Sequence, residues 1–346
     1  INNQMSNTPV EVLVTVAFSE GQLDRLRAVS PRLALTINPV RRAEDIPVDI
    51  WRRAEVLYTG GLLPDPGKVE LPNLHWVQFH FSGVDGILDA PLFQQEGITF
   101  TNLSGAAAPQ MAEYLLTMML ALGHKLPALM DFQSRAEWPR DRYERFSPRE
   151  LRGSTVGIVG YGSIGRELAR LLQPFGVKVL AAKKNVRQPK DIGYAPEGLG
   201  DPHGVYFYRL YPIEALKSML KECDFVALTV PLTAETQNLI GEEELRAMKS
   251  TAYIVDVSRG GIINPKALLS ALQDNRIAGA ALDVFYEEPL PSSSPFWKLK
   301  NAMVTPHISG HSAYYNERAI DLFVENLERY LQGDALLNCV DPLKGY

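Results

Sequence analysis

The chain has 346 residues, of which 46% are hydrophobic and 22% are charged, and its formal net charge is −5. The composition is that of an ordinary globular protein, and the length exceeds what one hydrophobic core usually supports, so we expect two domains. No basic tract is long enough to follow a phosphate backbone, and no apolar run reaches the roughly 18–20 residues that span a bilayer. The sequence therefore argues against nucleic-acid binding and against a membrane-spanning segment.

The terminal pattern and the cysteine content indicate the compartment. The first residues lack the charged segment and apolar stretch of a secretory signal, and the sequence has two cysteines, Cys223 and Cys339. We interpret both as buried thiols in a reducing compartment, a disulfide being the weaker interpretation, and expect the protein in the cytoplasm. We predict no metal site.

The first hundred residues alternate between short strand-like and helical segments. We predict strands at 12–16, 56–58, 76–81 and 99–102, and an amphipathic helix over 22–29 that Pro31 ends. Strands alternating with helices are typical of a parallel α/β sheet. This part of the chain has no glycine motif of its own.

Two segments of different character follow. Residues 106–126 are rich in Ala, Leu and Met and carry Pro109 near their start, where a helix tolerates proline. Such a long apolar helix must be buried, either in the core or in a subunit interface. Residues 135–149 are charged and aromatic and contain proline, which predicts an exposed excursion that reaches over a neighbour.

A glycine motif stands in the context that dinucleotide binding requires. A short apolar strand over 155–159 leads into Gly160-Tyr-Gly-Ser-Ile-Gly165, and leucines then recur at helical spacing up to Pro174. Gly160 permits a tight turn, Gly162 lets the backbone approach a pyrophosphate, and Gly165 allows close packing of the helix on the strand. The N–H groups at the start of the helix would bind the phosphates. The alternative is a plain glycine turn.

The end of the next strand, predicted over 177–181, bears on the choice of cofactor. NAD enzymes usually place an acidic residue about 20 residues after the glycines, where it binds the ribose 2′-hydroxyl. This sequence has Lys183-Lys184-Asn185 there, with Arg187 just beyond. Because two cations attract a 2′-phosphate, we predict that NADP(H) is preferred over NAD(H). The alternative is that both lysines belong to a solvated loop.

Three polar residues follow three further predicted strands. The segments 225–229, 252–257, 278–283 and 302–305 would bring this sheet to six strands. Arg259, Glu288 and His307 come shortly after the last three. Each alone is compatible with a surface or structural role, but ligands of open α/β sheets bind at the carboxyl ends of the strands.

These residue types match hydride transfer to a 2-keto acid. A histidine can donate the proton that the carbonyl oxygen needs, and a neighbouring carboxylate, Glu288, would orient its ring and favour its charged form. The guanidinium of Arg259 matches the planar substrate carboxylate better than an ammonium would. We also expect Asp283 to accept a hydrogen bond from the nicotinamide carboxamide, the alternative being a turn or capping aspartate.

At this point the sequence resembles the D-isomer-specific 2-hydroxyacid dehydrogenases, most densely over 151–310. The segments that carry the resemblance agree with the family in order and spacing: Gly160-Tyr-Gly-Ser-Ile-Gly165, Val230-Pro-Leu-Thr233, Val257-Ser-Arg-Gly260, Ala281-Leu-Asp-Val-Phe285, Glu288-Pro289 and Thr305-Pro-His-Ile-Ser-Gly310. Weaker likeness extends toward both ends, as at Ser82-Gly-Val-Asp85.

The resemblance implies an α/β fold of two doubly wound parallel-sheet domains. A Rossmann cofactor domain, residues 106–312, would be inserted into a flavodoxin-like substrate domain formed by 1–105 and 313–346. It also implies a homodimer that involves residues 106–126. Arg259, Glu288 and His307 would be catalytic, and Ser82, Gly83, Val84, Arg259 and His307 would bind the substrate. The cofactor would contact Gly160, Tyr161, Gly162, Ser163, Ile164, Gly165, Lys183, Lys184, Asn185, Val230, Pro231, Thr236, Val257, Ser258, Arg259, Asp283, His307, Ser309 and Gly310.

The sequence departs from the family pattern at Lys183, where NAD-using relatives carry an acid, and at 191–211, which resembles an insertion of no assigned function. The substrate expected from the resemblance is glyoxylate or hydroxypyruvate, with bulkier keto acids such as phenylpyruvate left open. Phe79, Phe81, Trp138 and Tyr314 are candidates for the pocket wall.

Three other functions compete with this one. Formate oxidation on a related fold uses glutamine where Glu288 stands. A cofactor-sensing, corepressor-like binding protein of the same fold is the main alternative, because such proteins can retain the catalytic residues. A catalytically silent Rossmann domain is disfavoured by the Arg, Glu and His together.

Overall fold

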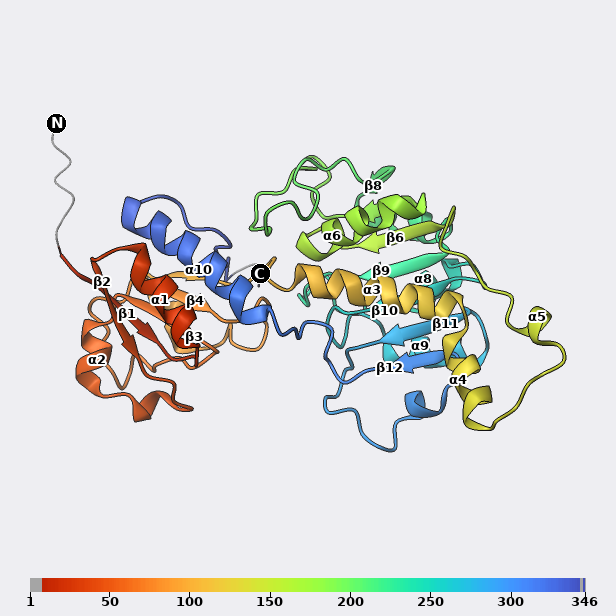
Figure 1. Ribbon diagram of the computed structural model, residues 1–346, viewed down its shortest axis with the longest axis horizontal. Helices are drawn as coiled ribbons and strands as arrows, with labels where there is room; N and C mark the ends of the chain where they lie inside the picture. Colours follow the sequence, from red (N-terminus) through yellow and green to blue (C-terminus); the bar gives the residue numbers. More distant parts are fainter. Residues whose placement is uncertain (1–7, 343–344, 346) are drawn as a thin grey trace. The chain divides into compact units, whose positions relative to one another are not determined.

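The computed structural model describes residues 8–342 and 345. These residues form two compact units, one built from the described residues up to Ala107 and from Ser312 onward, the other from Ala108–His311. Each unit is an α/β structure around an all-parallel sheet (Figure 1). The predicted fold class of two parallel-sheet domains is confirmed.

The smaller unit has five strands in the order β2-β1-β3-β4-β5, which is the flavodoxin-like arrangement. Its strands are β1 (Val10–Val14), β2 (Leu33–Ile37), β3 (Val56–Thr59), β4 (Trp76–Phe79) and β5 (Thr99–Thr101). Its helices are α1 (Glu20–Val29), α2 (Val48–Arg53) and α10 (Tyr315–Gln332).

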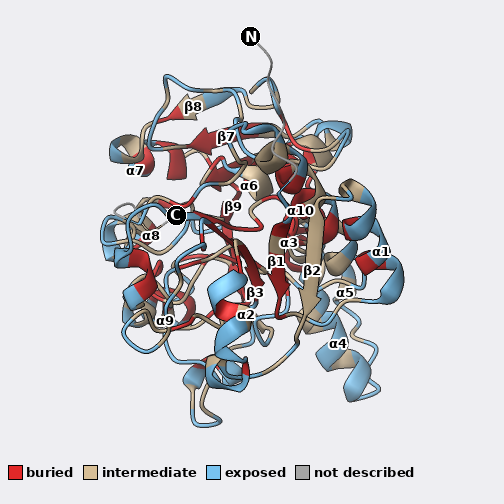
Figure 2. Cartoon of the chain, turned by 90° about the vertical axis from the view of Figure 1, so that its left-hand side faces the viewer, coloured by how far each residue is buried: buried red, intermediate tan, exposed pale blue. Residues whose placement is uncertain are grey.

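The other four of these strands were predicted from the sequence, and β2 was not, although its residues are mostly apolar. The central strand β3 is buried along its whole length, as its apolar sequence predicts, whereas every residue of the edge strand β2 is only half-buried (Figure 2). The helix α10, nearly 290 residues after α1 in the chain, packs beside it, and Glu317 accepts a hydrogen bond from Gln22 at 2.6 Å.

The larger unit has seven strands in the order β12-β11-β10-β9-β6-β7-β8. They are β6 (Thr155–Val159), β7 (Lys178–Ala182), β8 (Arg209–Tyr211), β9 (Phe225–Leu228), β10 (Tyr253–Asp256), β11 (Gly279–Leu282) and β12 (Ala302–Val304). The expectation of six strands is wrong because the short edge strand β8 pairs with β7 at the end of the segment interpreted as an insertion. Only one residue of β8 is buried, so its sequence lacks the apolar signal of the central strands.

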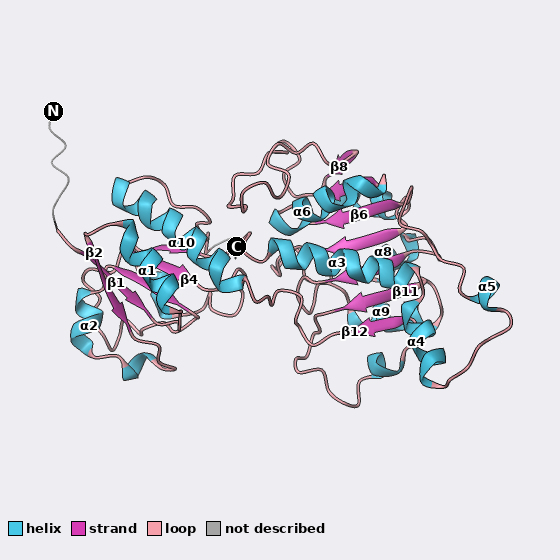
Figure 3. Ribbon diagram, in the orientation of Figure 1, coloured by secondary structure: helices cyan, strands magenta, loops and turns pink. Residues whose placement is uncertain are grey.

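Helices cover both faces of this sheet, so the unit is doubly wound (Figure 3). The helices of this unit are α3 (Ala108–Gly123), α4 (Leu126–Ser134), α5 (Arg142–Arg145), α6 (Ser163–Leu172), α7 (Leu216–Leu220), α8 (Glu242–Ala247) and α9 (Pro265–Gln273). Of these, α5 lies on the excursion after α4, away from the sheet (Figure 1). The helices α3 and α6 pack together over one face, and α7, α8 and α9 share a hydrophobic core with the strands on the other.

The long apolar helix predicted over 106–126 ends earlier, at Gly123. The chain then bends by 65° into α4. Among the described residues no single helix has the length and apolar character to cross a bilayer, and α3 and α4 meet those two criteria only when they are taken together.

Candidate active site

The glycine turn between β6 and α6 has the geometry that the motif predicts. Gly160 has a φ of +104°, and a Cβ there would lie 2.9 Å from the backbone nitrogen of Val230. A Cβ at Gly165 would lie 2.4 Å from the carbonyl oxygen of Gly160. Glycine is therefore required at both positions, once for the backbone conformation and once for the close approach of helix and strand.

The turn also offers the space and the donors that a dinucleotide needs. A Cβ at Gly162 would meet no atom within 4 Å, and α6 begins directly after it at Ser163. The N–H groups of the first helical turn have no partner within the helix and carry its partial positive charge. The turn therefore fits a pyrophosphate, with the backbone of Gly162, Ser163 and Ile164 as donors.

The residues after β9 lie against this turn. The hydroxyl of Thr229 donates to the carbonyl of Gly160 at 2.7 Å, which joins the two segments. Thr236 donates to the carbonyl of Pro231 at 2.6 Å, so its hydroxyl shapes this loop. The side chain of Val230 is buried.

At the end of β7 the two lysines differ in their surroundings. The ammonium of Lys183 donates to the carbonyl of Gln188 at 3.0 Å, and its pKa is lowered by burial and, secondarily, by the charge of Arg166. Lys184 is exposed and pairs with Glu235. Asn185 is exposed, and its side chain accepts a hydrogen bond from the amide of Arg187. The structure therefore brings Lys183 into a partly buried position and leaves Lys184 at the surface.

Glu288 and His307 meet at the carboxyl edge of the sheet. Nδ1 of His307 lies 2.7 Å from Oε2 of Glu288, and the other carboxylate oxygen accepts the amide of Phe285 at 2.9 Å. The exposed fraction is 44% for the histidine side chain and 35% for the glutamate, so the imidazole can reach a ligand. The pair has the arrangement that orients a general acid.

Asp283, fully buried at the end of β11, shapes the turn that carries His307. Its carboxylate accepts hydrogen bonds from the hydroxyl of Thr305 and from the amides of Ile308 and Ser309, at 2.6, 2.9 and 2.8 Å. The sequence predicts a nicotinamide contact for Asp283, with this turn role as the alternative. The structure shows the turn contacts, and the nicotinamide contact remains a prediction.

A second buried carboxyl group, that of Asp256, binds the backbone just before Arg259. The carboxyl group of Asp256 at the end of β10 accepts hydrogen bonds from the amide and the hydroxyl of Ser258, and burial raises the pKa of Asp256 to about 7. A Cβ at Gly260 would lie 1.8 Å from the carbonyl oxygen of Phe285, so the backbone beside Arg259 packs against the segment that leads to Glu288. This role of Asp256 was not predicted, because its only signal in the sequence is an acid at the end of an otherwise apolar strand.

Two further predictions concern substrate binding by residues 82–84 and a pocket wall at Phe79. Ser82, Gly83 and Val84 follow β4 in the smaller unit, and among the described residues none of their three amide nitrogens donates a backbone hydrogen bond. The prediction of Phe79 as a pocket wall is wrong, because its ring is fully buried and stacks on Phe81 and Phe93.

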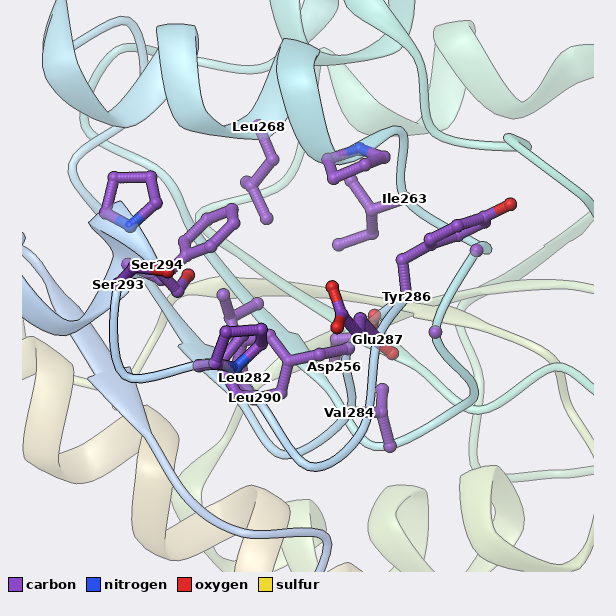
Figure 4. A pocket seen from close by; sticks show the side chains of 17 residues that line it. Asp256, Ile263, Leu268, Leu282, Val284, Tyr286, Glu287, Leu290, Ser293 and Ser294 are labelled. Carbon is purple, nitrogen blue, oxygen red and sulfur yellow. The ribbon is translucent and has the colours of Figure 1, made fainter.

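A cavity of about 370 Å³ lies beside the strand ends, between the segment 284–296 and the start of α9 (Figure 4). Asp256, Gly260 and Glu287 contribute to its lining, whereas Arg259, Glu288, His307 and the glycine turn do not. The cavity is therefore not the place where the predicted catalytic residues would act. The described residues contain no group of three or more His, Cys, Asp or Glu that could hold a metal ion.

Comparisons with known proteins identify the family of this chain. Residues 116–309 match the family described as "D-isomer specific 2-hydroxyacid dehydrogenase, NAD binding domain". The chain is 33% identical to a glyoxylate reductase of Korarchaeum cryptofilum over 289 aligned residues, and the alignment covers 81% of each protein. It is 35% identical to a glyoxylate reductase of Thermococcus kodakarensis over 268 aligned residues, and the alignment covers 76% of this chain and 75% of that protein.

The fold has solved relatives as well. A D-isomer specific 2-hydroxyacid dehydrogenase from Xanthobacter autotrophicus Py2, solved in complex with NADPH and MES, superimposes with a TM-score of 0.75 at 28% identity over 98% of this chain and all of the other. The range that matches the family model, residues 116–309, contains the glycine turn, Arg259, Glu288 and His307. The chain therefore belongs to the D-isomer specific 2-hydroxyacid dehydrogenase family and is an NAD(P)-dependent oxidoreductase.

Proposed function

We propose that the protein reduces glyoxylate, hydroxypyruvate or a similar small 2-keto acid to the D-2-hydroxy acid, with His307 as proton donor. The observation that carries this proposal is the 2.7 Å contact between His307 and Glu288 at the edge of a sheet whose glycine turn fits a dinucleotide. The bound nicotinamide cofactor supplies the hydride. The same residues serve the reverse reaction.

His307 holds the proton that the substrate oxygen receives. Because Nδ1 faces the carboxylate of Glu288, we assign the Nδ1 hydrogen to that contact, which leaves Nε2 to exchange a proton with the substrate. Glu288 fixes the ring and stabilises its positive charge, and Phe285 fixes Glu288 through its amide. When the substrate oxygen takes the proton, the imidazole becomes neutral and the carboxylate still holds its orientation.

Arg259 binds the substrate carboxylate. Its Nη1 donates to the carbonyl of Ser258 at 2.9 Å, which holds one terminal nitrogen of the guanidinium in place. A planar fork with several donors can bind a carboxylate through two hydrogen bonds. In the smaller unit, the backbone amides of Ser82, Gly83 and Val84 are proposed to bind substrate.

NADP(H) is the preferred cofactor in this proposal. A lysine, Lys183, stands at the end of β7 where an NAD enzyme would place a carboxylate, and its ammonium is held in place by Gln188. The relative from Xanthobacter autotrophicus Py2 was solved with NADPH, which supports the same choice. The names of the curated relatives support glyoxylate as the first substrate to test.

The protein is proposed to form a homodimer and to act in the cytoplasm. Large apolar side chains are exposed on α4 and in the excursion after it: Leu126, Leu129, Met130, Trp138 and Tyr143. Exposed apolar surface of this extent is typical of an interface, and a second copy of the chain is the proposed occupant. Both cysteines are free thiols, which is typical of a reducing compartment. Cys223 is buried as expected, whereas Cys339 is exposed, so the expectation of a buried thiol is wrong there.

Oxidation of NADPH and of NADH in the presence of a panel of keto acids tests the function. We expect turnover with glyoxylate or hydroxypyruvate and a higher kcat/KM with NADPH. A higher kcat/KM with NADH would contradict the cofactor assignment. Tight cofactor binding without turnover on any keto acid would contradict the reductase assignment and favour the corepressor-like alternative.

A further inference from the structure

The loop that connects β7 to β8, residues 183–208, contains no helix or strand although it is 26 residues long. Loops of this length without secondary structure are uncommon in compact domains and usually have a function. This loop, called the insert loop below, includes most of the segment that the sequence analysis left without a role. It begins at Lys183, the residue proposed to recognise the cofactor.

A fully buried arginine anchors the insert loop to the glycine turn. Arg166 is the residue directly after Gly165, and its side chain has no exposed surface. Its Nη1 donates to the carbonyl of Asp201 at 2.6 Å, and its Nη2 donates to the carbonyl of Pro189 at 2.7 Å. Its Nε makes no hydrogen bond and lies 3.6 Å from the carboxylate of Asp191. One guanidinium therefore holds three points of the loop.

A second anchor joins the loop to the glycine motif itself. The hydroxyl of Tyr161, inside the motif, donates to the buried carboxylate of Asp201 at 2.7 Å. The same carboxylate accepts the amides of Val205 and Tyr206, each at 2.9 Å. Asp201 is thus the centre of a buried network that ties the far end of the loop to the turn. A buried carboxylate is stabilised when its oxygens accept hydrogen bonds, as here.

A third contact comes from the next residue of α6. Glu167 is buried and accepts the amide of Gly200 at 2.7 Å. The loop also closes on itself, since a Cβ at Gly204 would lie 2.4 Å from the carbonyl oxygen of Pro189. These contacts fix the loop from Pro189 to Tyr206 as an ordered structure against the first turn of α6.

The near end of the loop orients Lys183. The carbonyl of Gln188, one residue before the anchored Pro189, accepts the hydrogen bond from the ammonium of Lys183. Arg166 also lies close enough to Lys183 to contribute to the lowering of its pKa. The anchors at Arg166 and Asp201 and the lysine are therefore parts of one assembly.

We infer that the insert loop sets the preference for a 2′-phosphorylated cofactor, with Arg166, Tyr161 and Asp201 as positioning residues that act through Lys183. This inference rests on the proposed NADP(H) preference and names the residues that produce it. The ligand group is the phosphate on the adenosine ribose. An anchored Gln188 holds the ammonium in one orientation, so less rotamer freedom is lost when the phosphate binds.

Asp201→Asn separates positioning from simple electrostatics. Removing a negative charge near the site raises the local positive potential, so electrostatics alone predicts tighter binding of a phosphate. Positioning predicts the opposite, because asparagine keeps only one acceptor oxygen and its NH₂ group would face a hydroxyl or amide hydrogen that the carboxylate accepts. The sign of the change therefore distinguishes the two causes.

The test measures binding of adenosine 2′,5′-bisphosphate and of 5′-AMP by calorimetry, without turnover. We expect the unmodified protein to prefer the bisphosphate and Asp201→Asn to lower that preference by roughly tenfold. Tyr161→Phe, which removes only the hydroxyl, should lower it in the same direction and by less. Lys217→Met, which breaks an exposed ion pair with Glu243 on α8, is the matched control and should leave the ratio unchanged.

Two further measurements decide the outcome. Amide hydrogen exchange over 188–206 should increase in Asp201→Asn, and the effect of Asp201→Asn on the ratio should disappear in a Lys183→Met background. A ratio that is unchanged or higher in Asp201→Asn, or an effect that persists without Lys183, would overturn the inference. An unmodified protein that does not prefer the bisphosphate would instead overturn the proposed NADP(H) preference.

Discussion

The carboxylate of Asp283 accepts the hydroxyl hydrogen of Thr305 at 2.6 Å, and this contact joins the end of β11 to the turn after β12. The amide of His307 donates to the backbone carbonyl of Asp283 at 2.9 Å, and the histidine itself has a φ of +50°. A positive φ is uncommon for a residue other than glycine and persists where the surroundings hold it. Asp283 supplies these surroundings, so it positions the proposed proton donor.

Asp283→Asn should therefore lower kcat by about 10–100-fold, because a misplaced donor no longer matches the reacting oxygen. An amide in place of the carboxylate would turn its NH₂ group toward one of the N–H donors. Steady-state kinetics at saturating cofactor would measure the loss. Asp224→Asn is the matched control: Asp224 is also buried and accepts the amide of Thr155, but it precedes β9 at the opposite edge of the sheet. We expect it to lower the melting temperature with little change in kcat, and equal losses of kcat would contradict the assignment.

Replacing the proposed proton donor tests the chemistry itself. His307→Ala should lower kcat for reduction by roughly 10²–10⁴ while the protein still binds the cofactor. Glu288→Gln keeps the shape of the side chain and removes its charge, so we expect a smaller loss in the same parameter. Cofactor binding followed by fluorescence would show that the site remains intact. Turnover close to that of the unmodified protein in a folded His307→Ala variant would rule out the assignment.

Arg259 should affect substrate binding as well as turnover. Arg259→Lys keeps the positive charge but loses the planar fork, so we expect KM for the keto acid to rise about tenfold. Arg259→Ala should raise KM further and lower kcat. The exposed Arg246 on α8, which pairs with Glu242, provides a control variant, Arg246→Ala, that should leave both parameters unchanged. A KM that stays constant in Arg259→Lys and Arg259→Ala would contradict a carboxylate contact.

Sequence patterns predicted the strands that lie in the middle of the two sheets, because burial on both faces makes them continuously apolar. The edge strand β8 was missed because it is short and only one of its residues is buried, whereas β2 was missed although its sequence, Leu33-Ala-Leu-Thr-Ile37, is mostly apolar. The apolar composition around Gly123 did not reveal the end of α3. A Cβ at Gly123 would lie 2.5 Å from the carbonyl oxygen of Arg149, a contact with a distant residue that sequence does not show.

In the candidate site, too, some contacts between residues distant in sequence could not be predicted. The strand ends pointed to Glu288 and His307, because the chemistry of the side chains and their place in the fold are both visible in sequence. The roles of Asp256 and Asp201 depend on hydrogen bonds to backbone amides, and those depend on the folded path of a loop. The prediction of Phe79 as a wall was wrong because an aromatic residue near a strand end can belong equally to the core.

The exposed apolar side chains after α3 give a prediction about assembly. Trp138 is 83% exposed and Met130 is 55% exposed, so replacing them with serine removes apolar surface without opening a cavity. We expect the unmodified protein to be a dimer by light scattering and a Met130→Ser, Trp138→Ser double variant to dissociate at a higher concentration. Ile192→Ser, a change at an equally exposed residue of the insert loop, is the control. A monomeric unmodified protein would contradict the proposed homodimer.

The buried carboxyl group of Asp256 gives a prediction about pH. Burial raises its pKa from 3.8 to about 7, so the folded protein keeps the proton over a range in which the unfolded chain has lost it. The unfolded state therefore binds fewer protons in this range, and this group's contribution to stability falls as the pH rises from about 4 to about 7 and is constant above. Asp256→Asn cannot ionise and keeps an oxygen that can accept the amide of Ser258.

The melting temperature of Asp256→Asn, taken relative to that of the unmodified protein, should consequently rise by several degrees between pH 5 and pH 8. Thermal unfolding in buffers of matched ionic strength would measure this difference. Asp274→Asn serves as control, since Asp274 is an exposed carboxylate at the end of α9 that accepts a hydrogen bond from Ser270. For that variant we expect the difference to stay constant with pH. A difference that is also constant for Asp256→Asn would show that the carboxyl group ionises in the folded protein as readily as in the unfolded chain.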